Sequence, residues 1–373
     1  MNKVMKRILQ ILSVILAVVV LAAIAFFGLY FTRIQTFSSI EQLTDYEDGY
    51  NLYRMDVQYD YNLDNIINYG ITDDHTMIDA IVKEAMPLLP VKIEAPNFGC
   101  TAFTLTDKDG GVHMGRNYDF GKDTSSMLVY CEPKDGYKSI AFAALDNVSA
   151  NVTDDSIKSK FASLTAPFVC LDGMNEKGVS IAVLTLDSEP VHQNTGKPVI
   201  FTTLAIRLVL DRAATTEEAV ELLRSYDMFA SSGRDYHFYI TDASGDGRVI
   251  EYDIDSESRE LIDTPSEAVT NFFITHKDEV LPNQKNGIYG HGKERYDAVL
   301  KVLETEKGNY TGDTVWNAMK SAAQDPNPDD ITSNTQWSIA YNNTDLTAEI
   351  AIRRNWDNVT LCELENKVTT PVK

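Results

Sequence analysis

The chain is poor in cysteine and in positive charge. Its cysteines are too few and too scattered for a disulfide scaffold, and no pair has the C-x-x-C spacing of a structural zinc site. None of its six histidines lies in an H-E-x-x-H motif, which argues against a zinc protease of that type. Lys plus Arg number 33 against 55 Asp plus Glu, for a net charge of −22. This deficit argues against nucleic acid as a partner, because binding its phosphates requires a basic face.

Charge is absent altogether from one long stretch near the N-terminus, Ile8–Phe31. At about 1.5 Å per residue this run spans roughly 36 Å as a helix, enough to cross a hydrocarbon core of about 30 Å. Lys3, Lys6 and Arg7 precede it, so the positive-inside rule places the N-terminus in the cytoplasm and the rest outside. The sequence therefore predicts a single-pass membrane anchor with an extracytoplasmic domain.

A cleaved signal peptide is the alternative for this segment. Ala23-Ile24-Ala25 has the small-x-small form of a cleavage site. The apolar run continues past it to Phe31, which favours the anchor. Both interpretations export the domain that follows, either held at the cell membrane or secreted.

The whole chain is 44% apolar and can bury a large core, and the patterning after the N-terminal segment predicts strands and helices in separate blocks. Blocks of this kind indicate an α+β fold rather than alternating β-α-β units. The expected hairpins pair Thr101–Thr106 with Val112–Asn117, Met127–Cys131 with Ser139–Ala144, Pro167–Leu171 with Gly178–Leu186, Tyr236–Thr241 with Arg248–Asp253, and Gln336–Tyr341 with Leu346–Arg353. Helices are expected at Asp74–Ala85, Thr202–Ala213, from Thr215, at Glu294–Glu304 and at Thr314–Ala323. Pro87 and Pro90 are expected to end the first of them.

Cys100 differs from the other cysteines in its surroundings. It follows Gly99 and opens the first hairpin, whose return strand should bring Arg116 and Asp119 alongside it. A guanidinium near a thiol favours the thiolate. Composition alone favours the alternative of a core cysteine beside a surface Arg–Asp pair, and no histidine has a context that marks it as a papain-like partner. The other three cysteines, Cys131, Cys170 and Cys362, are expected in the core.

Gly99–Phe103 followed by Gly115–Phe120 resembles the start of the choloylglycine hydrolase family, which includes bile salt hydrolases and penicillin V acylases. The resemblance continues at 173–179, 269–271 and 292–296, and covers roughly residues 98–355. Members are N-terminal nucleophile (Ntn) hydrolases. The resemblance implies a four-layer αββα sandwich, here preceded by the N-terminal transmembrane helix.

The resemblance also implies roles for individual residues. Cys100 would be the nucleophile, and its own freed α-amine, with an ordinary pKa of about 7.7–8.0, would be the general base. Asp119 would hold that amine, and Arg116 would lie beside the thiol. Asn271 would donate its side-chain NH₂ to the oxyanion.

Two further positions complete the implied site. Arg295 would complete the polar network. Thr185 stands where the family often has Asn or Tyr, and it can serve the oxyanion through its backbone N–H. No metal or organic cofactor is implied.

A free α-amine requires a cut, because 99 residues precede Cys100. Ceramidase-type relatives make this cut themselves, by attack of the thiol on the preceding carbonyl. We therefore expect three parts: 1–33 as cytoplasmic tip and anchor or signal, 34–99 as a propeptide or retained fragment, and 100–373 as the amidohydrolase domain. The helix at 74–85 could hold the fragment in place.

The expected function is an extracytoplasmic amidase that hydrolyses a non-peptide linear C–N bond through a Cys100 thioester. The substrate would be a small acyl amide, such as a bile-salt or penicillin V-like compound. Two alternatives stay open: an acyltransferase that uses the same acyl-enzyme, and a non-catalytic anchored surface domain. The sequence does not determine the oligomeric state, and a homo-oligomer is one option.

Overall fold

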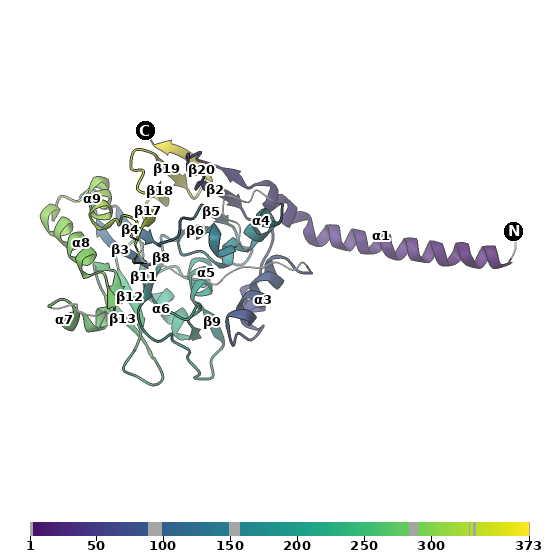
Figure 1. Cartoon of the computed structure of the whole chain (residues 1–373), viewed down its shortest axis with the longest axis horizontal. Coiled ribbons are helices and arrows are strands. Elements are labelled where there is room, and N and C mark those ends of the chain that lie inside the picture. Colours follow the sequence, from purple (N-terminus) through teal and green to yellow (C-terminus); the bar gives the residue numbers. More distant parts are fainter. Residues whose placement is uncertain are drawn as a thin grey trace.

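The computed structural model describes residues 3–88, 99–148, 157–282, 290–327, 329–330 and 333–372. Two large sheets form the centre of the domain, and a long helix leaves it on one side (Figure 1). The first sheet has nine strands, antiparallel except for the parallel pair β2 and β5. Its order is β1 (Glu41–Gln42), β2 (Leu52–Asp56), β5 (Ser126–Cys131), β6 (Ser139–Ala144), β7 (Asp172–Asn175), β8 (Ser180–Leu186), β11 (Asp235–Thr241), β12 (Arg248–Tyr252) and β13 (Leu261–Pro265).

The second sheet has seven antiparallel strands and carries the hairpin expected around Cys100. Its order is β14 (Ala268–Val269), β3 (Gly99–Thr106), β4 (Val112–Asp119), β17 (Thr335–Asn342), β18 (Thr347–Ile352), β19 (Val359–Glu363) and β20 (Val368–Val372). Two small sheets pair β9 (Val199–Phe201) with β10 (Asp227–Phe229), and β15 (Asn271–Phe272) with β16 (Gly290–His291).

Helices cover the outer face of each sheet. On the nine-stranded sheet, α5 (Thr202–Arg212) lies on β7 and β8, followed by α6 (Thr216–Arg224). On the seven-stranded sheet, α8 (Lys293–Glu306) lies near β3, and α9 (Gly312–Ala322) packs on β4 and β17. The inner faces of the sheets meet where β3 contacts β8 and β11. The α+β, four-layer αββα sandwich is therefore confirmed.

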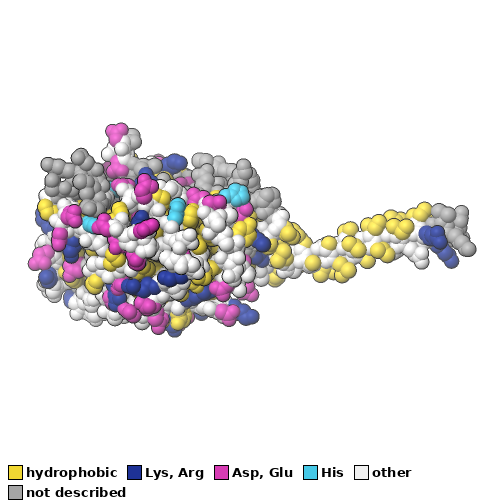
Figure 2. Space-filling view, turned by 90° about the horizontal axis from the view of Figure 1, so that it is seen from below, with side chains coloured by type: hydrophobic (Ala, Val, Ile, Leu, Met, Phe, Trp, Pro, Cys, Tyr) yellow, Lys and Arg dark blue, Asp and Glu magenta, His cyan; other side chains and the backbone are white. Residues whose placement is uncertain are grey.

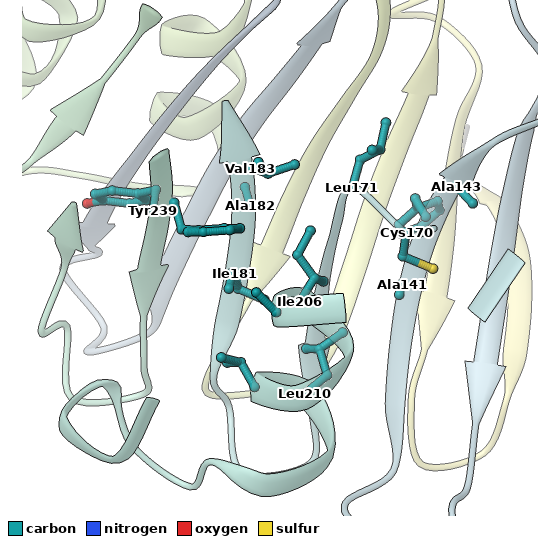
Figure 3. Close-up of a cluster of buried hydrophobic side chains, with 14 of the residues drawn as sticks. Ala141, Ala143, Cys170, Leu171, Ile181, Ala182, Val183, Ile206, Leu210 and Tyr239 are labelled. Atoms are coloured by element: carbon teal, nitrogen blue, oxygen red, sulfur yellow. The ribbon is translucent and has the colours of Figure 1, made fainter. Parts of the chain in front are cut away.

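The core is built mainly from aliphatic side chains of the sheets and α5. Figure 3 shows Ile206 and Leu210 of α5 facing Ile181 of β8. Cys131, Cys170 and Cys362 are buried, as expected for small apolar core residues. Most expected strands and helices are present with bounds shifted by one or two residues.

One expected strand is wrong. Residues 163–168 form the 3₁₀ helix η2 (Ser163–Phe168), and the next strand, β7, begins only at Asp172. Pro167 has no N–H to donate to a strand ladder, which fits its place inside a helical turn. Other short helices are η1 (Leu145–Val148), α4 (Ile157–Ala162), η3 (Ile274–His276) and α7 (Lys277–Val280).

The N-terminal helix α1 (Lys3–Ser38) is long and apolar enough to cross a membrane, and its most apolar part is not buried against the domain. Figure 2 shows apolar side chains along it and Lys and Arg side chains at its far end. Residues after it form β1, β2, α2 (Leu63–Ile67) and α3 (Asp74–Ala85), so this region contributes two strands to the nine-stranded sheet. The helix expected at 74–85 is confirmed, and Pro90, expected to end it together with Pro87, lies outside the described residues.

Candidate active site

Cys100 lies near the start of β3, with its side chain fully buried between the two sheets. The Arg116 guanidinium and the backbone N–H of Asp119 act on its thiol, and both lower its pKa. Burial raises the pKa of Cys100 to about 11, and it outweighs the lowering by Arg116. In the chain joined through Gly99–Cys100, which we call the uncut chain, the thiol is therefore neutral at pH 7. The thiolate expected from Arg116 alone does not form there.

Arg116 is held by three acceptors. Its Nε donates to Asp172 Oδ2 at 3.2 Å, Nη1 to the Asn117 carbonyl at 2.8 Å and Nη2 to the Val183 carbonyl at 3.0 Å. Val183 is on β8, so Arg116 links the two sheets directly behind Cys100. This placement fixes the guanidinium beside the thiol.

Asp172, at the start of β7, is a site residue that the sequence analysis missed. It is fully buried and also accepts hydrogen bonds from Trp337 Nε1 at 3.3 Å and the Tyr341 hydroxyl at 2.5 Å. Burial raises the pKa of Asp172, and Arg116 opposes that rise. Its partners are far away in the sequence, so nothing in the local pattern marks it.

Asn271 and Arg295 meet at the backbone of Cys100. Arg295 Nη1 donates to the Cys100 carbonyl at 2.6 Å, and Arg295 Nη2 donates to Asn271 Oδ1 at 2.8 Å. The Cys100 N–H also donates to Asn271 Oδ1, at 3.0 Å. Both partners are donors, so the amide oxygen of Asn271 must face them. Its NH₂ then points to the other side, where one hydrogen goes to the Thr185 carbonyl at 2.8 Å.

A glycine makes room for Arg295. Gly292 precedes α8 with a φ of 88°, and a Cβ there would lie 2.4 Å from Nη2 of Arg295. Only glycine accepts both this left-handed conformation and this contact without strain. The 292–296 segment places Arg295 in the site because the backbone at Gly292 can pass this close to the guanidinium.

Thr185 lies on β8 with its peptide edge turned toward Asn271. The Val183 N–H donates to the Leu171 carbonyl at 3.0 Å, so the peptide edge of Val183 faces away from β11. Successive residues of a strand direct their N–H and C=O groups to opposite sides. Thr185, two residues after Val183, therefore directs its N–H and C=O to the same side as Val183. Its carbonyl accepts from Asn271, and its N–H shares that edge. The Thr185 hydroxyl turns instead to the Asp235 carbonyl, at 3.4 Å.

Asp119 lies opposite Gly99 in the β3–β4 register, with no solvent exposure. Its carboxylate accepts from the Thr335 hydroxyl at 2.6 Å, from Gln324 Nε2 at 3.1 Å and from Arg295 at 3.4 Å. Burial raises its pKa, and Arg295 is the largest opposing influence. In the uncut chain the Cys100 N–H is bonded to Asn271. Thr335 and Gln324 are further partners that no sequence pattern signalled.

A buried histidine–glutamate pair braces the segment that carries Asn271. His237 Nε2 contacts the Thr270 carbonyl at 2.8 Å, and Nδ1 contacts Glu251 Oε1 at 3.1 Å. Glu251 also accepts from the N–H groups of Ile274 at 2.7 Å and Thr275 at 3.0 Å. A carbonyl only accepts, so Nε2 of His237 carries a hydrogen. The pair thus forms hydrogen bonds with the backbone on both sides of Asn271.

The structure therefore brings all six expected site residues, Cys100, Arg116, Asp119, Thr185, Asn271 and Arg295, into one buried network. No group of three or more His, Cys, Asp or Glu within the described ranges is placed to hold a metal ion. The Asp242–Gly247 segment is the turn between β11 and β12, as the hairpin expected there requires.

Residues 100–266 match the family model described as linear amide C-N hydrolases, choloylglycine hydrolase family. The resemblance to the choloylglycine hydrolase family is confirmed. None of the curated proteins matches the chain at a significant level.

Similar solved structures agree on the fold. A mutant of conjugated bile acid hydrolase from Clostridium perfringens has a TM-score of 0.54 at 14% identity, over 74% of this chain and 96% of that one. Another variant of that enzyme has a TM-score of 0.53 at 15% identity, over 74% and 97%. Penicillin V acylase from Agrobacterium tumefaciens has a TM-score of 0.53 at 18% identity, over 71% and 86%. Identities this low establish shared architecture.

Proposed function

We propose that this protein is an extracytoplasmic amidase that cleaves a linear amide C–N bond with Cys100 as nucleophile. The observation that carries the proposal is the convergence of Cys100, Arg116, Asp119, Asn271 and Arg295 from separate elements onto one strand end. A thiol, two guanidiniums, a carboxylate and an amide donor are the groups that thioester chemistry needs.

The first step is a cut at Gly99–Cys100. The thiol of Cys100 attacks the Gly99 carbonyl, the peptide nitrogen takes the proton, and a thioester joins the Gly99 acyl group to sulfur. Water then hydrolyses the thioester and leaves a carboxylate on Gly99 and a free α-amine on Cys100. The neutral, buried thiol of the uncut chain fits a precursor at rest.

The second step is acylation by substrate. The new α-amine takes the thiol proton, and the sulfur attacks the substrate carbonyl. The second hydrogen of Asn271 Nδ2 and the Thr185 N–H share one edge, where they can bind the developing oxyanion. The α-ammonium of Cys100 gives its proton to the amine of the substrate, which leaves. Water then hydrolyses the thioester that remains on Cys100. In this last step the α-amine takes a proton from the attacking water and passes it to the sulfur, so that the acid leaves and the thiol of Cys100 is restored.

Residues 34–88 are proposed to stay bound after the cut. β2 lies between β1 and β5, and Leu52 and Met55 have no solvent exposure. The Tyr59 hydroxyl donates to the Leu164 carbonyl at 2.6 Å across the cut. A fragment that supplies strands to the central sheet is held by main-chain hydrogen bonds and apolar burial. It would keep the hydrolase tethered to α1, with Lys6 and Arg7 on the cytoplasmic side.

The substrate class follows from the site and its neighbours. The expected substrate is an acyl amide with an apolar acyl group and a small polar amine. Conjugated bile acid and penicillin V are acted on by the similar enzymes and are the first candidates. An acyltransferase would differ only in the acceptor that removes the acyl group.

The test is amine release from a panel of N-acyl amides by the purified protein. Cys100→Ala should abolish release, and Cys362→Ala, a matched change at another buried cysteine, should keep it. Activity that survives Cys100→Ala would refute the proposed nucleophile. A wild-type chain that stays joined through Gly99–Cys100 and is inert on the whole panel would favour the non-catalytic alternative.

A further inference from the structure

The helix α1 joins the domain without a break. It runs to Ser38, and its last turn is fastened to the domain. Phe37 stacks on Phe161 with ring centroids 4.8 Å apart, and the Gln58 N–H donates to the Thr36 hydroxyl at 2.8 Å. These contacts fix the direction of the helix relative to the domain.

Arg33, the first charged residue after the apolar run, points into the domain. Arg33 would ordinarily extend to the lipid headgroups from the end of a membrane helix. Here it is buried, and its Nε and Nη2 donate to the carbonyls of Ala85 at 2.6 Å and Glu84 at 2.8 Å. These carbonyls belong to the last turn of α3, where backbone acceptors lack helical partners. The C-terminal end of α3 is therefore level with the outer end of the apolar run.

The next contact lies closer to the membrane. The Tyr30 hydroxyl donates to the Pro87 carbonyl, and Tyr30 is buried there although it belongs to the apolar run. It stands three residues before Arg33, about 4.5 Å nearer the N-terminus along the helix. A hydrocarbon core of about 30 Å accommodates roughly 20 residues, so a run beginning at Ile8 reaches the outer interface near residue 28. Pro87 then lies in the interfacial layer.

The side chains beside Pro87 suit that layer. Leu88 is 84% exposed, the largest exposure among the large apolar residues of the described chain. Tyr69 is 38% exposed, with the Lys83 ammonium 5.2 Å from the centre of its ring. Tyr69, Lys83 and Pro87 line one hollow of about 450 Å³. In Figure 1, α3 lies on the side of the domain from which α1 leaves.

We propose that Tyr69, Lys83, Pro87 and Leu88 form a juxtamembrane face that docks onto the outer leaflet, with Leu88 inserted at the boundary of headgroups and acyl chains. Apolar insertion is the suitable contact, because a net charge of −22 gives the protein no attraction to an anionic bilayer. Lys83 and the hollow beside it give headgroups polar partners. This inference rests on the proposed anchor and adds to it a fixed orientation of the domain.

The test measures membrane depth with an environment-sensitive fluorophore on the full chain in phosphatidylcholine vesicles. The fluorophore is attached to Leu88→Cys, to Val19→Cys in the middle of the apolar run, and to Asn309→Cys in the turn between α8 and α9. All four native cysteines are buried, and the unsubstituted chain taken through the same labelling sets the background. Nitroxide lipids that quench near the headgroups or near the bilayer centre report depth.

The inference predicts loss of fluorescence at position 88 with the shallow quencher, loss at 19 with the deep quencher, and none at 309. Quenching at 19 without quenching at 88 would overturn the docking face and leave the anchor intact. An unquenched position 19 would overturn the anchor and the docking face together. Equal quenching at 88 and 309 would also overturn a specific face. Amine release by the Leu88→Cys protein, measured in parallel, keeps these outcomes separate from a failure of the proposed amidase.

Discussion

Arg116 Nε donates to Asp172 Oδ2 at 3.2 Å, and neither side chain is exposed to solvent. This pair holds the guanidinium that contacts the Cys100 thiol, so the position of the proposed nucleophile depends on a carboxylate from the other sheet.

Asp172→Ala should therefore destabilise the protein by about 3–5 kcal/mol, the usual cost of leaving one partner of a buried ion pair alone. Denaturant unfolding of the purified domain measures this loss. Tyr341→Phe removes only one hydrogen bond to the same carboxylate and should cost about 1 kcal/mol. Equal losses for the two variants would contradict the importance given to the Arg116–Asp172 pair.

The buried thiol of Cys100 should make the stability of the uncut chain depend on pH. Burial raises the pKa of Cys100 to about 11 from an ordinary value of 9.0, so the folded uncut chain holds this proton more tightly than the unfolded chain. Its contribution to stability is complete below pH 9 and is lost as the pH rises toward 11.

Alkylation of Cys100 in the uncut chain should accordingly be very slow at pH 7 and accelerate as the pH approaches 11. Mass spectrometry of the alkylated peptides follows each cysteine separately. Cys362, whose pKa burial raises to about 12, serves as an internal control and should react later. Rapid labelling of Cys100 at pH 7 in uncut chain would show that Arg116 outweighs burial.

Substitution of Asn271 should lower the turnover rate strongly. Asn271→Ala removes a proposed oxyanion donor, and kcat should fall by about 10²–10³. Steady-state kinetics on the best amide of the panel measures it. A variant that raises KM and leaves kcat unchanged would place Asn271 in substrate binding instead.

The His237–Glu251 pair should act through Asn271. Glu251→Gln removes the charge that holds His237 and the N–H groups of Ile274 and Thr275, so kcat should fall while KM changes little. His113→Gln is the matched control, because His113 pairs with Asp107 at the far end of the β3–β4 hairpin. A similar loss in both variants would indicate a general effect on folding.

Retention of the N-terminal fragment can be tested by disrupting β2. Met55→Lys places a charge in a fully buried position of the central sheet, and the cut fragment should then separate from the hydrolase. Tyr53→Lys, at a partly exposed position of the same strand, should leave the fragment bound. Size-exclusion chromatography in detergent distinguishes the two results. Separation of the cut wild-type chain would contradict retention.

Local patterns predicted the parts of this molecule whose partners are near in sequence. The β3–β4 hairpin, α3 and α6 depend on a turn or a cap a few residues away, and Thr215 accepts the Glu218 N–H at 3.1 Å as its spacing indicates. The resemblance to known hydrolases added Asn271 and Arg295, which no local pattern could link to Cys100.

Long-range partners could not be predicted in this way. Asp172 joins Arg116, Trp337 and Tyr341 only because the two sheets pack face to face. β2 was missed because its place in the sheet depends on β5, some 70 residues on. The balance between burial and Arg116 at Cys100 also required the structure, since exposure cannot be read from spacing.

The most direct test of the account is the intact mass and N-terminal sequence of the protein recovered from membranes, compared with Cys100→Ala. We predict two wild-type chains, one ending at Gly99 and one starting at Cys100, and a single uncut chain for the variant. A wild-type chain still joined through Gly99–Cys100 under conditions where amide hydrolysis is measured would contradict it, because the proposed base would not exist.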